Sequence, residues 1–256
     1  MSAARKTIVM IHGMWGGGWY WDNYRRFFEA KGYQCLAPDL RYHDMPANQM
    51  PLAKLGATGL LDYAADLEIE IRALPEKPIL FGHSMGGLLA QILASRDCAQ
   101  AAVCITPAAP AGILSLRYSV LKSFFGIFTR GAFWKHAHQL DYERAVYAMM
   151  HKLPDAERRA IYNRCGWESG RVMAEIGLWP LGFKGAQVDA SRVTCPMLIV
   201  AGAEDRITPA SVVRKVAQKY QPRSTYMEFA GHAHWILKEP GWEKPAAQIA
   251  AWLEAQ

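Results

Sequence analysis

The amino-acid sequence predicts an α/β fold: a mostly parallel six-stranded sheet with helices on both faces, and an inserted helical cap. Two observations lead to this fold class. Short apolar runs alternate with longer segments of helical periodicity, which is typical of a parallel sheet covered on both sides. Between about residues 107 and 193 this alternation stops, and helix-like segments rich in aromatic residues and methionine replace it.

Six apolar runs have the length of buried strands. The first follows Arg5 and Lys6 directly, so the segment before it is too short for the apolar core of a signal peptide. The predicted strands are residues 7–11, 33–37, 78–81, 102–105, 197–201 and 225–229.

Five segments outside the region 107–193 have helical periodicity and supply the two layers that cover the sheet. In the last of them Ile249, Ala250 and Leu253 recur at helical spacing. The predicted helices are residues 21–31, 60–74, 87–95, 210–219 and 243–254. Residues 41–59 form the only long irregular stretch, because Pro46, Pro51 and Gly56 interrupt regular structure.

The region 107–193 divides the chain into two predicted domains. Residues 1–106 and 194–256 form the core domain, and residues 107–193 form the inserted helical cap. Within the cap, residues 112–134 carry Arg117, Lys122 and Arg130 among apolar residues. We interpret this segment as a cap helix that covers an apolar pocket. The alternative is an interfacial helix on a membrane, which leaves room for lipid-like substrates.

Composition excludes several classes of protein. With 256 residues, 51% hydrophobic and 20% charged, the chain can bury a large core. The net charge of +6 comes from Lys and Arg residues spread along the chain, so we expect no nucleic-acid partner. No apolar stretch reaches membrane-spanning length, so no stable membrane insertion is expected.

Five cysteines are odd in number, widely spaced and without a Cys-x-x-Cys pair: Cys35, Cys98, Cys104, Cys165 and Cys195. Neither a disulfide framework nor a metal site has this spacing. We therefore expect buried, reduced thiols and a cytoplasmic location.

A Gly-x-Ser-x-Gly motif lies between a predicted strand and a predicted helix. Ser84 stands between Gly82 and Gly86, directly after the apolar run 78–81 and before the helical stretch 88–95. A sharp strand-turn-helix elbow needs small neighbours two positions away and presents its serine hydroxyl at the end of the sheet. This context predicts Ser84 as a nucleophile.

A serine nucleophile needs a general base and an acid that orients the base. Asp205 follows the strand 197–201, which places a carboxylate at the edge of the sheet where ligands bind in α/β folds. His232 and His234 both follow the last strand, so the chain offers two histidines where one is needed. The order Ser, Asp, His fits this arrangement.

These residues resemble the α/β-hydrolases, and within them the cap-bearing esterases of the plant methyl esterase and hydroxynitrile lyase branch. The resemblance covers nearly the whole chain and is carried by the Ser84 elbow and by the segments Ile11-His12-Gly13-Met14-Trp15-Gly16-Gly17-Gly18-Trp19-Tyr20-Trp21, Ala37-Pro38-Asp39-Leu40 and Pro240-Gly241-Trp242. It implies that the N–H groups of Met85 and Met14 form the oxyanion hole, with Trp15 as the alternative to Met14, and that His12 organises its loop.

The resemblance also bears on the choice of base. His232 lies in a Gly-His dipeptide that is common in the family. His234 is followed by Trp235, and Glu239 comes five residues later, a spacing that related hydrolases often show. We predict His234 as the base, with His232 as the alternative.

The predicted function is hydrolysis of carboxylic esters of small to medium apolar compounds by a cofactor-free serine hydrolase. Trp15, Trp19 and His83 are the predicted substrate-binding residues. No metal is predicted, because the cap histidines His136, His138 and His151 have no acidic partner at a suitable offset.

Several alternatives to a simple ester hydrolase use the same residues. A lactonase, a thioesterase or a carbon–carbon bond hydrolase would share the triad. A hydroxynitrile lyase would use Ser84 as part of an acid-base pair and would need a lysine near the base, for which Lys238 is the candidate. The alternative outside enzymes is a small-ligand receptor on a hydrolase scaffold. The oligomeric state, monomer or homodimer, is left open.

Overall fold

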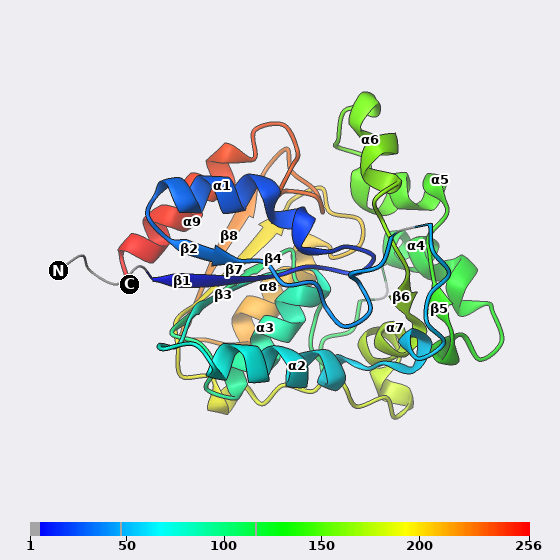
Figure 1. The fold of residues 1–256 in the computed structure, drawn as a ribbon, viewed down its shortest axis with the longest axis horizontal. Coiled ribbons are helices and arrows are strands. Elements are labelled where there is room, and N and C mark those ends of the chain that lie inside the picture. The colour runs from blue at the N-terminus through cyan, green and yellow to red at the C-terminus, as the bar shows by residue number, and fades with distance from the viewer. Residues whose placement is uncertain (1–5, 47, 116) are drawn as a thin grey trace.

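Six parallel strands form the sheet at the centre of the molecule, as predicted (Figure 1). The computed structural model describes residues 6–46, 48–115 and 117–256. The strands lie in the order β2-β1-β3-β4-β7-β8. Their bounds are Thr7–Ile11 for β1, Gln34–Leu36 for β2, Ile79–His83 for β3, Ala101–Ile105 for β4, Met197–Gly202 for β7 and Ser224–Phe229 for β8.

Helices cover both faces of this sheet, which explains why β3, β4 and β7 are buried along their whole length. Helices α1 and α9 lie on one face, and α2, α3 and α8 lie on the other (Figure 1). Their bounds are Asp22–Ala30 for α1, Leu60–Arg72 for α2, Met85–Ser95 for α3, Ala210–Lys219 for α8 and Glu243–Glu254 for α9. The predicted α/β-hydrolase architecture is therefore confirmed.

Most differences between predicted and observed elements are confined to their ends. Helix α3 begins at Met85, two residues earlier than predicted, because it starts directly after the elbow without an intervening loop. The predicted irregular stretch 41–59 includes one short 3-10 turn, Leu55–Ala57.

Between β4 and β7 the chain leaves the sheet and forms a separate layer at one end of it, opposite the start of β1 and the end of α9 (Figure 1). We call residues 107–193 the cap segment. It contains α4 at Tyr118–Phe128, β5 at Ala137–His138, α5 at Tyr142–Ala145, a π-helical turn at Val146–Met150, α6 at Asp155–Tyr162, β6 at Glu168–Ser169 and α7 at Gly170–Gly177. Strands β5 and β6 pair antiparallel.

Two of the predicted chemical properties can be compared with the fold. All five cysteines are buried and none forms a disulfide. Among the described residues, no helix has both the length and the apolar composition that crossing a membrane requires.

Candidate active site

Ser84 occupies a strained turn between β3 and α3. Its backbone has φ 55° and ψ −118°, a conformation that side-chain-bearing residues rarely adopt. A Cβ atom at Gly82 would lie 2.1 Å from the carbonyl oxygen of Gly86, and one at Gly86 would lie 2.1 Å from that of Ile11. Glycine at both positions allows this tight turn, because any larger residue would clash there. Ser84 is partly exposed, while its neighbours are buried.

Asp205 and His234 form a buried pair near the carboxyl ends of the strands. His234 Nδ1 lies 2.8 Å from Asp205 Oδ2, and the other carboxylate oxygen accepts the backbone N–H groups of Ile207 and Thr208 at 2.8 and 2.9 Å. The Thr208 hydroxyl also donates to Asp205 Oδ2 at 2.8 Å. A carboxylate that accepts from Nδ1 leaves Nε2 of the imidazole unprotonated and available as a base.

The second histidine has a different partner. His232 Nδ1 lies 3.3 Å from Glu239 Oε2, and burial lowers the pKa of His232. Glu239 itself accepts the N–H groups of Ala233 and Trp235 at 2.7 and 3.1 Å, while burial raises the pKa of its carboxyl group to about 7. Glu239 thus holds the backbone N–H groups of the two residues that flank His234.

Two backbone N–H groups near Ser84 have the environment of an oxyanion hole. The Met14 N–H and the Met85 N–H make no hydrogen bond to a protein acceptor within the described residues. Gly13 packs so closely on the nucleophile that a Cβ there would lie 2.9 Å from Ser84 Cβ. Unpaired N–H groups beside a serine hydroxyl are suited to an anionic oxygen.

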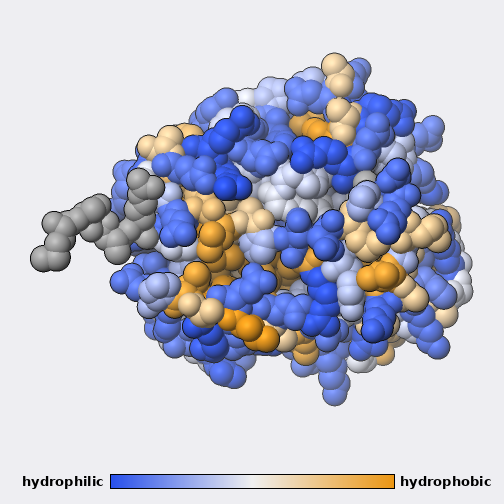
Figure 2. Space-filling view, viewed as in Figure 1, coloured by the Kyte–Doolittle hydropathy of each residue, from blue (hydrophilic) through white to orange (hydrophobic). Residues whose placement is uncertain are grey.

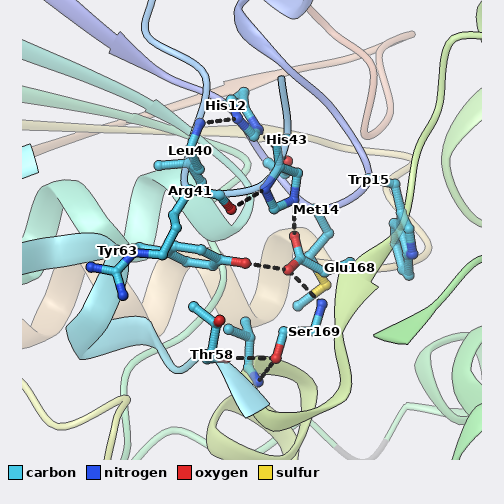
Figure 3. Close-up of polar contacts among 12 residues, drawn as sticks. His12, Met14, Trp15, Leu40, Arg41, His43, Thr58, Tyr63, Glu168 and Ser169 are labelled. Atoms are coloured by element: carbon cyan, nitrogen blue, oxygen red, sulfur yellow. Dashed lines mark hydrogen bonds and ion pairs between the residues drawn. The ribbon is translucent and has the colours of Figure 1, made fainter. Parts of the chain in front are cut away.

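His12 organises the loop that carries Met14. Its Nε2 accepts the Leu40 N–H at 3.0 Å, so Nδ1 carries the proton and donates to the Gly13 carbonyl at 2.8 Å (Figure 3). Burial and the neighbouring His43 lower the pKa of His12 to about 3. His12 therefore stays neutral and fixed at neutral pH.

Trp15 connects this loop to the cap segment. Its indole Nε1 donates to the His138 carbonyl at 3.0 Å, and its own carbonyl accepts the Gly166 N–H at 2.8 Å. Trp15 has φ 61°, and its ring stacks on Phe124 with centroids 6.1 Å apart. The residue next to Met14 is thus held by β5 and by the loop before β6.

A buried polar network anchors the cap segment to the core beside Trp15 (Figure 3). Glu168 of β6 is fully buried and accepts the Tyr63 hydroxyl at 2.9 Å and the Ser169 N–H at 2.7 Å. His43 Nε2 lies 3.1 Å from the same carboxylate. Burial disfavours the charge on His43, but Glu168 outweighs it and raises the pKa of His43.

The cavity in front of Ser84 is enclosed by core and cap residues and has a volume of about 210 Å³. Its lining includes Met14, Trp15, His83 and His234 from the core and apolar side chains of α4 and α7 from the cap segment. No charged Lys, Arg, Asp or Glu side chain lines it among the described residues. Among the described residues, no hydrogen bond joins Ser84 to His234. Hydrogen bonds between catalytic groups are often long without substrate and shorten when substrate binds.

Two of the three predicted substrate-binding residues, Trp15 and His83, line this cavity. His83 also supports the base, because its Nε2 donates to the His234 carbonyl at 2.8 Å, and burial lowers its pKa to about 3. The structure places Trp19 elsewhere. Its indole lines a second cavity, with Arg164 4.2 Å from the ring centroid, whereas the next residue, Tyr20, lines the first.

Three features of the site were not found by sequence reasoning. Thr208 lies three residues after Asp205. At this spacing an Asp side chain typically accepts a hydrogen bond from the backbone of its own turn, and this signal could have indicated Thr208. The acceptor of the Trp15 indole, His138, lies 123 residues away, and Glu168 lies 125 residues from His43. No local pattern indicates contacts at such separations. Within the described residues, no cluster of three or more His, Cys, Asp or Glu side chains could hold a metal ion.

Comparisons with known proteins agree with this fold. Residues 8–252 match the sequence model of the Alpha/beta hydrolase family. The chain therefore belongs to this family, the α/β-hydrolases. A curated relative, salicylic acid-binding protein 2 of Nicotiana tabacum, is 36% identical over 86 residues, which are 32% of this chain and 31% of that protein. The matched region thus spans about a third of the relative's length.

Solved structures resemble the chain over nearly its whole length. A methylesterase, MES16, from Arabidopsis superposes with a TM-score of 0.74 at 14% identity, covering 98% of this chain and 100% of that chain. The monoacylglycerol lipase of Paleococcus ferrophilus has a TM-score of 0.70 at 26% identity, covering 96% and 93%. The likeness to MES16, at 14% identity, shows a shared fold alone.

Proposed function

We propose that this chain is a serine esterase that cleaves carboxylic esters of small to medium apolar compounds. The observation that carries the proposal is that His234, paired with Asp205, lines one cavity together with Ser84 and Met14. Among the described residues this cavity has no charged Lys, Arg, Asp or Glu in its lining, and the Met14 N–H has no protein acceptor. The relatives named as a methylesterase and a lipase act on esters by their names, which supports the same class of reaction here.

In the proposed reaction, Ser84 Oγ attacks the acyl carbon while His234 Nε2 takes the hydroxyl proton. The N–H groups of Met14 and Met85 stabilise the oxyanion of the tetrahedral intermediate. His234 then donates its proton to the leaving alcohol, and the acyl group remains on Ser84. Water attacks this acyl-enzyme with His234 again as base, which releases the acid and restores Ser84.

We further propose that residues 107–193 act as a cap over the nucleophile. Side chains from α4 and α7 close the cavity opposite Ser84. Because they are apolar, burial of an apolar acyl or alcohol group provides binding energy there, and few polar groups restrict its shape. The same groups can attack lactones, thioesters and carbon–carbon bonds. The shape of the cavity therefore determines which of these substrates is bound and cleaved.

One observation weighs against a hydroxynitrile lyase. Lys238 forms part of neither the cavity wall nor the His234 pair, since its Nζ lies 5.5 Å from the Trp19 ring centroid and 3.7 Å from Asp22. No lysine lines the cavity among the described residues.

Hydrolysis of p-nitrophenyl esters from acetate to decanoate, by the wild type and by Ser84→Ala, tests the proposal. We expect turnover that depends on Ser84 and a chain-length profile set by the cavity. A folded wild-type protein that hydrolyses no ester, lactone or thioester would favour the small-ligand receptor instead.

A further inference from the structure

The outer face of α4 carries a stripe of large apolar side chains that are open to solvent. Leu114, just before the helix, is 41% exposed, Tyr118 is 75% exposed, Leu121 is 46% exposed and Phe125 is 65% exposed. Tyr118, Leu121 and Phe125 are three and four residues apart, which places them along one side of the helix, and Leu114 precedes it. We call these four residues the α4 stripe. A contiguous apolar surface of this kind marks a site of interaction.

The α4 stripe is continuous with the cavity of Ser84. The other side of α4 faces the cavity through Val120, Phe124 and Phe128, while Leu114 and Leu121 both line the cavity and reach the surface. An apolar molecule in contact with Leu114 and Leu121 therefore touches two side chains that also line the cavity.

The surroundings of the α4 stripe are basic. Between residues 98 and 140 the chain has no Asp or Glu, and it has four exposed cations at Arg117, Lys122, Arg130 and Lys135. Arg117 donates to the Ser211 hydroxyl at 3.0 Å, and Lys122 Nζ lies 4.1 Å from the Tyr147 ring centroid, so neither charge is neutralised by these contacts.

The acidic residues closest in the fold do not reverse this charge. Asp141 and Glu143 line one groove with three residues of the stripe, but the same groove is also lined by Lys122, Arg144 and Arg159. Asp141 forms an ion pair with Arg144. The balance around the stripe therefore stays positive.

We propose that the α4 stripe docks this protein on an anionic lipid surface. Apolar side chains enter the boundary between headgroups and acyl chains while Lys and Arg contact anionic headgroups, and the two contributions together give reversible binding. A second copy of the chain fits this face poorly, because pairing the two stripes would bring like charges together. Helix α4 also lies at the end of the molecule opposite the start of β1 and the end of α9, so the core does not obstruct the contact (Figure 1).

Flotation with vesicles tests this binding without any turnover. The Ser84→Ala protein is mixed with vesicles of phosphatidylcholine containing phosphatidylglycerol, and with pure phosphatidylcholine vesicles as the reference. We expect binding to the anionic vesicles that weakens as ionic strength rises. Because turnover is not measured, failure of the proposed esterase activity leaves this result unaffected.

Substitutions separate the two contributions. Tyr118→Ser with Phe125→Ser should weaken vesicle binding at least about tenfold, because both side chains lose their apolar contact with lipid. Arg117→Gln and Lys122→Gln should each weaken it roughly fivefold. The matched control is Ile69→Ser on α2, an equally exposed apolar residue at 71% that lies outside the stripe and should leave binding unchanged.

Two kinds of result would overturn the proposal. The first is that the folded Ser84→Ala protein does not bind anionic vesicles, or that the stripe variants leave its binding unchanged. The other is a doubled mass in light scattering that Tyr118→Ser and Phe125→Ser abolish, because the stripe would then be the interface between two copies.

Discussion

The two walls of the Ser84 cavity are built in opposite ways. The core wall presents polar groups that are each held by directional bonds: His234 by Asp205, the peptides around His234 by Glu239, and the Met14 loop by His12. The cap wall presents apolar side chains of α4 and α7, which hold their places by packing. Changes at the core wall should therefore reduce kcat, and changes at the cap wall should alter which substrates bind.

The largest expected effect is at the core wall. His234→Ala should reduce kcat/KM at least about 10³-fold, because the proton of Ser84 then has no acceptor. Its matched control is His232→Ala, which removes a histidine two residues away that is paired with Glu239 instead of Asp205. We expect that control to lose less than about tenfold, measured with one p-nitrophenyl ester.

The reverse order of these two effects would assign the base to His232. Thermal unfolding of both variants should accompany the kinetics, since Glu239 also holds the loop. A kinetic loss in His234→Ala at unchanged stability is the expected result.

The next effect concerns the anchor that fixes the cap wall to the core. Glu168→Gln should lower the free energy of unfolding by about 3 kcal/mol near pH 6, because it leaves the buried His43 charge without its partner. Glu168 raises the pKa of His43 above the value of about 6.5 expected in the unfolded chain. The pair therefore stabilises the fold fully below that pH, and this contribution is lost as the pH rises through the folded-state pKa.

Urea unfolding of the wild type and of Glu168→Gln across neutral and alkaline pH checks both the size of this contribution to stability and the direction of its pH dependence. The difference between the two proteins should shrink as the pH rises. The control is Glu68→Gln, whose partly exposed ion pairs with Arg72 and Arg96 should contribute less than about 1 kcal/mol. A pH-independent difference at Glu168 would contradict the charged pair.

Trp15 belongs to the core wall but is held by the cap segment, so it tests whether the two walls act independently. Trp15→Phe keeps an aromatic ring against Phe124 and removes the hydrogen bond to the His138 carbonyl. We expect kcat to fall about tenfold, less than the loss of a whole oxyanion donor, because the Met14 N–H is loosened and not removed. KM should change little.

Inhibition by an alkylboronic acid, which forms a tetrahedral adduct on serine, should weaken in parallel with kcat in Trp15→Phe. Trp19→Phe is the control, since that ring lines the second cavity. If KM rises in Trp15→Phe while kcat and boronate binding stay constant, the cap does not support the oxyanion loop.

The two walls also differ in how far the sequence predicts them. The Ser84 elbow was predictable because glycine spacing and the flanking strand and helix are local. The pairing of His234 with Asp205 was a choice between two histidines on one loop, and a contact between residues 29 apart decides which of them reaches the carboxylate. Trp19 was misplaced because adjacency to Trp15 in sequence does not show where the chain turns, and the cap wall depends on contacts such as Trp15 to His138 that no spacing encodes.

The smallest expected effect is at the cap wall, where two adjacent phenylalanines of α4 point in opposite directions. Phe124 lines the cavity, so Phe124→Ala should enlarge it and raise kcat/KM for decanoate relative to acetate by about fivefold. Phe125 is exposed, so Phe125→Ala should leave the chain-length profile unchanged for esters dissolved in water. The absolute kcat for acetate should stay close to wild type in both variants. Phe124 contacts the oxyanion loop only through the Trp15 ring, and Phe124→Ala leaves the hydrogen bond from Trp15 to the His138 carbonyl in place. An altered kcat in Phe124→Ala with an unaltered profile would mean that the cap wall controls the chemistry and not the fit, and the contrast between the two walls would fail.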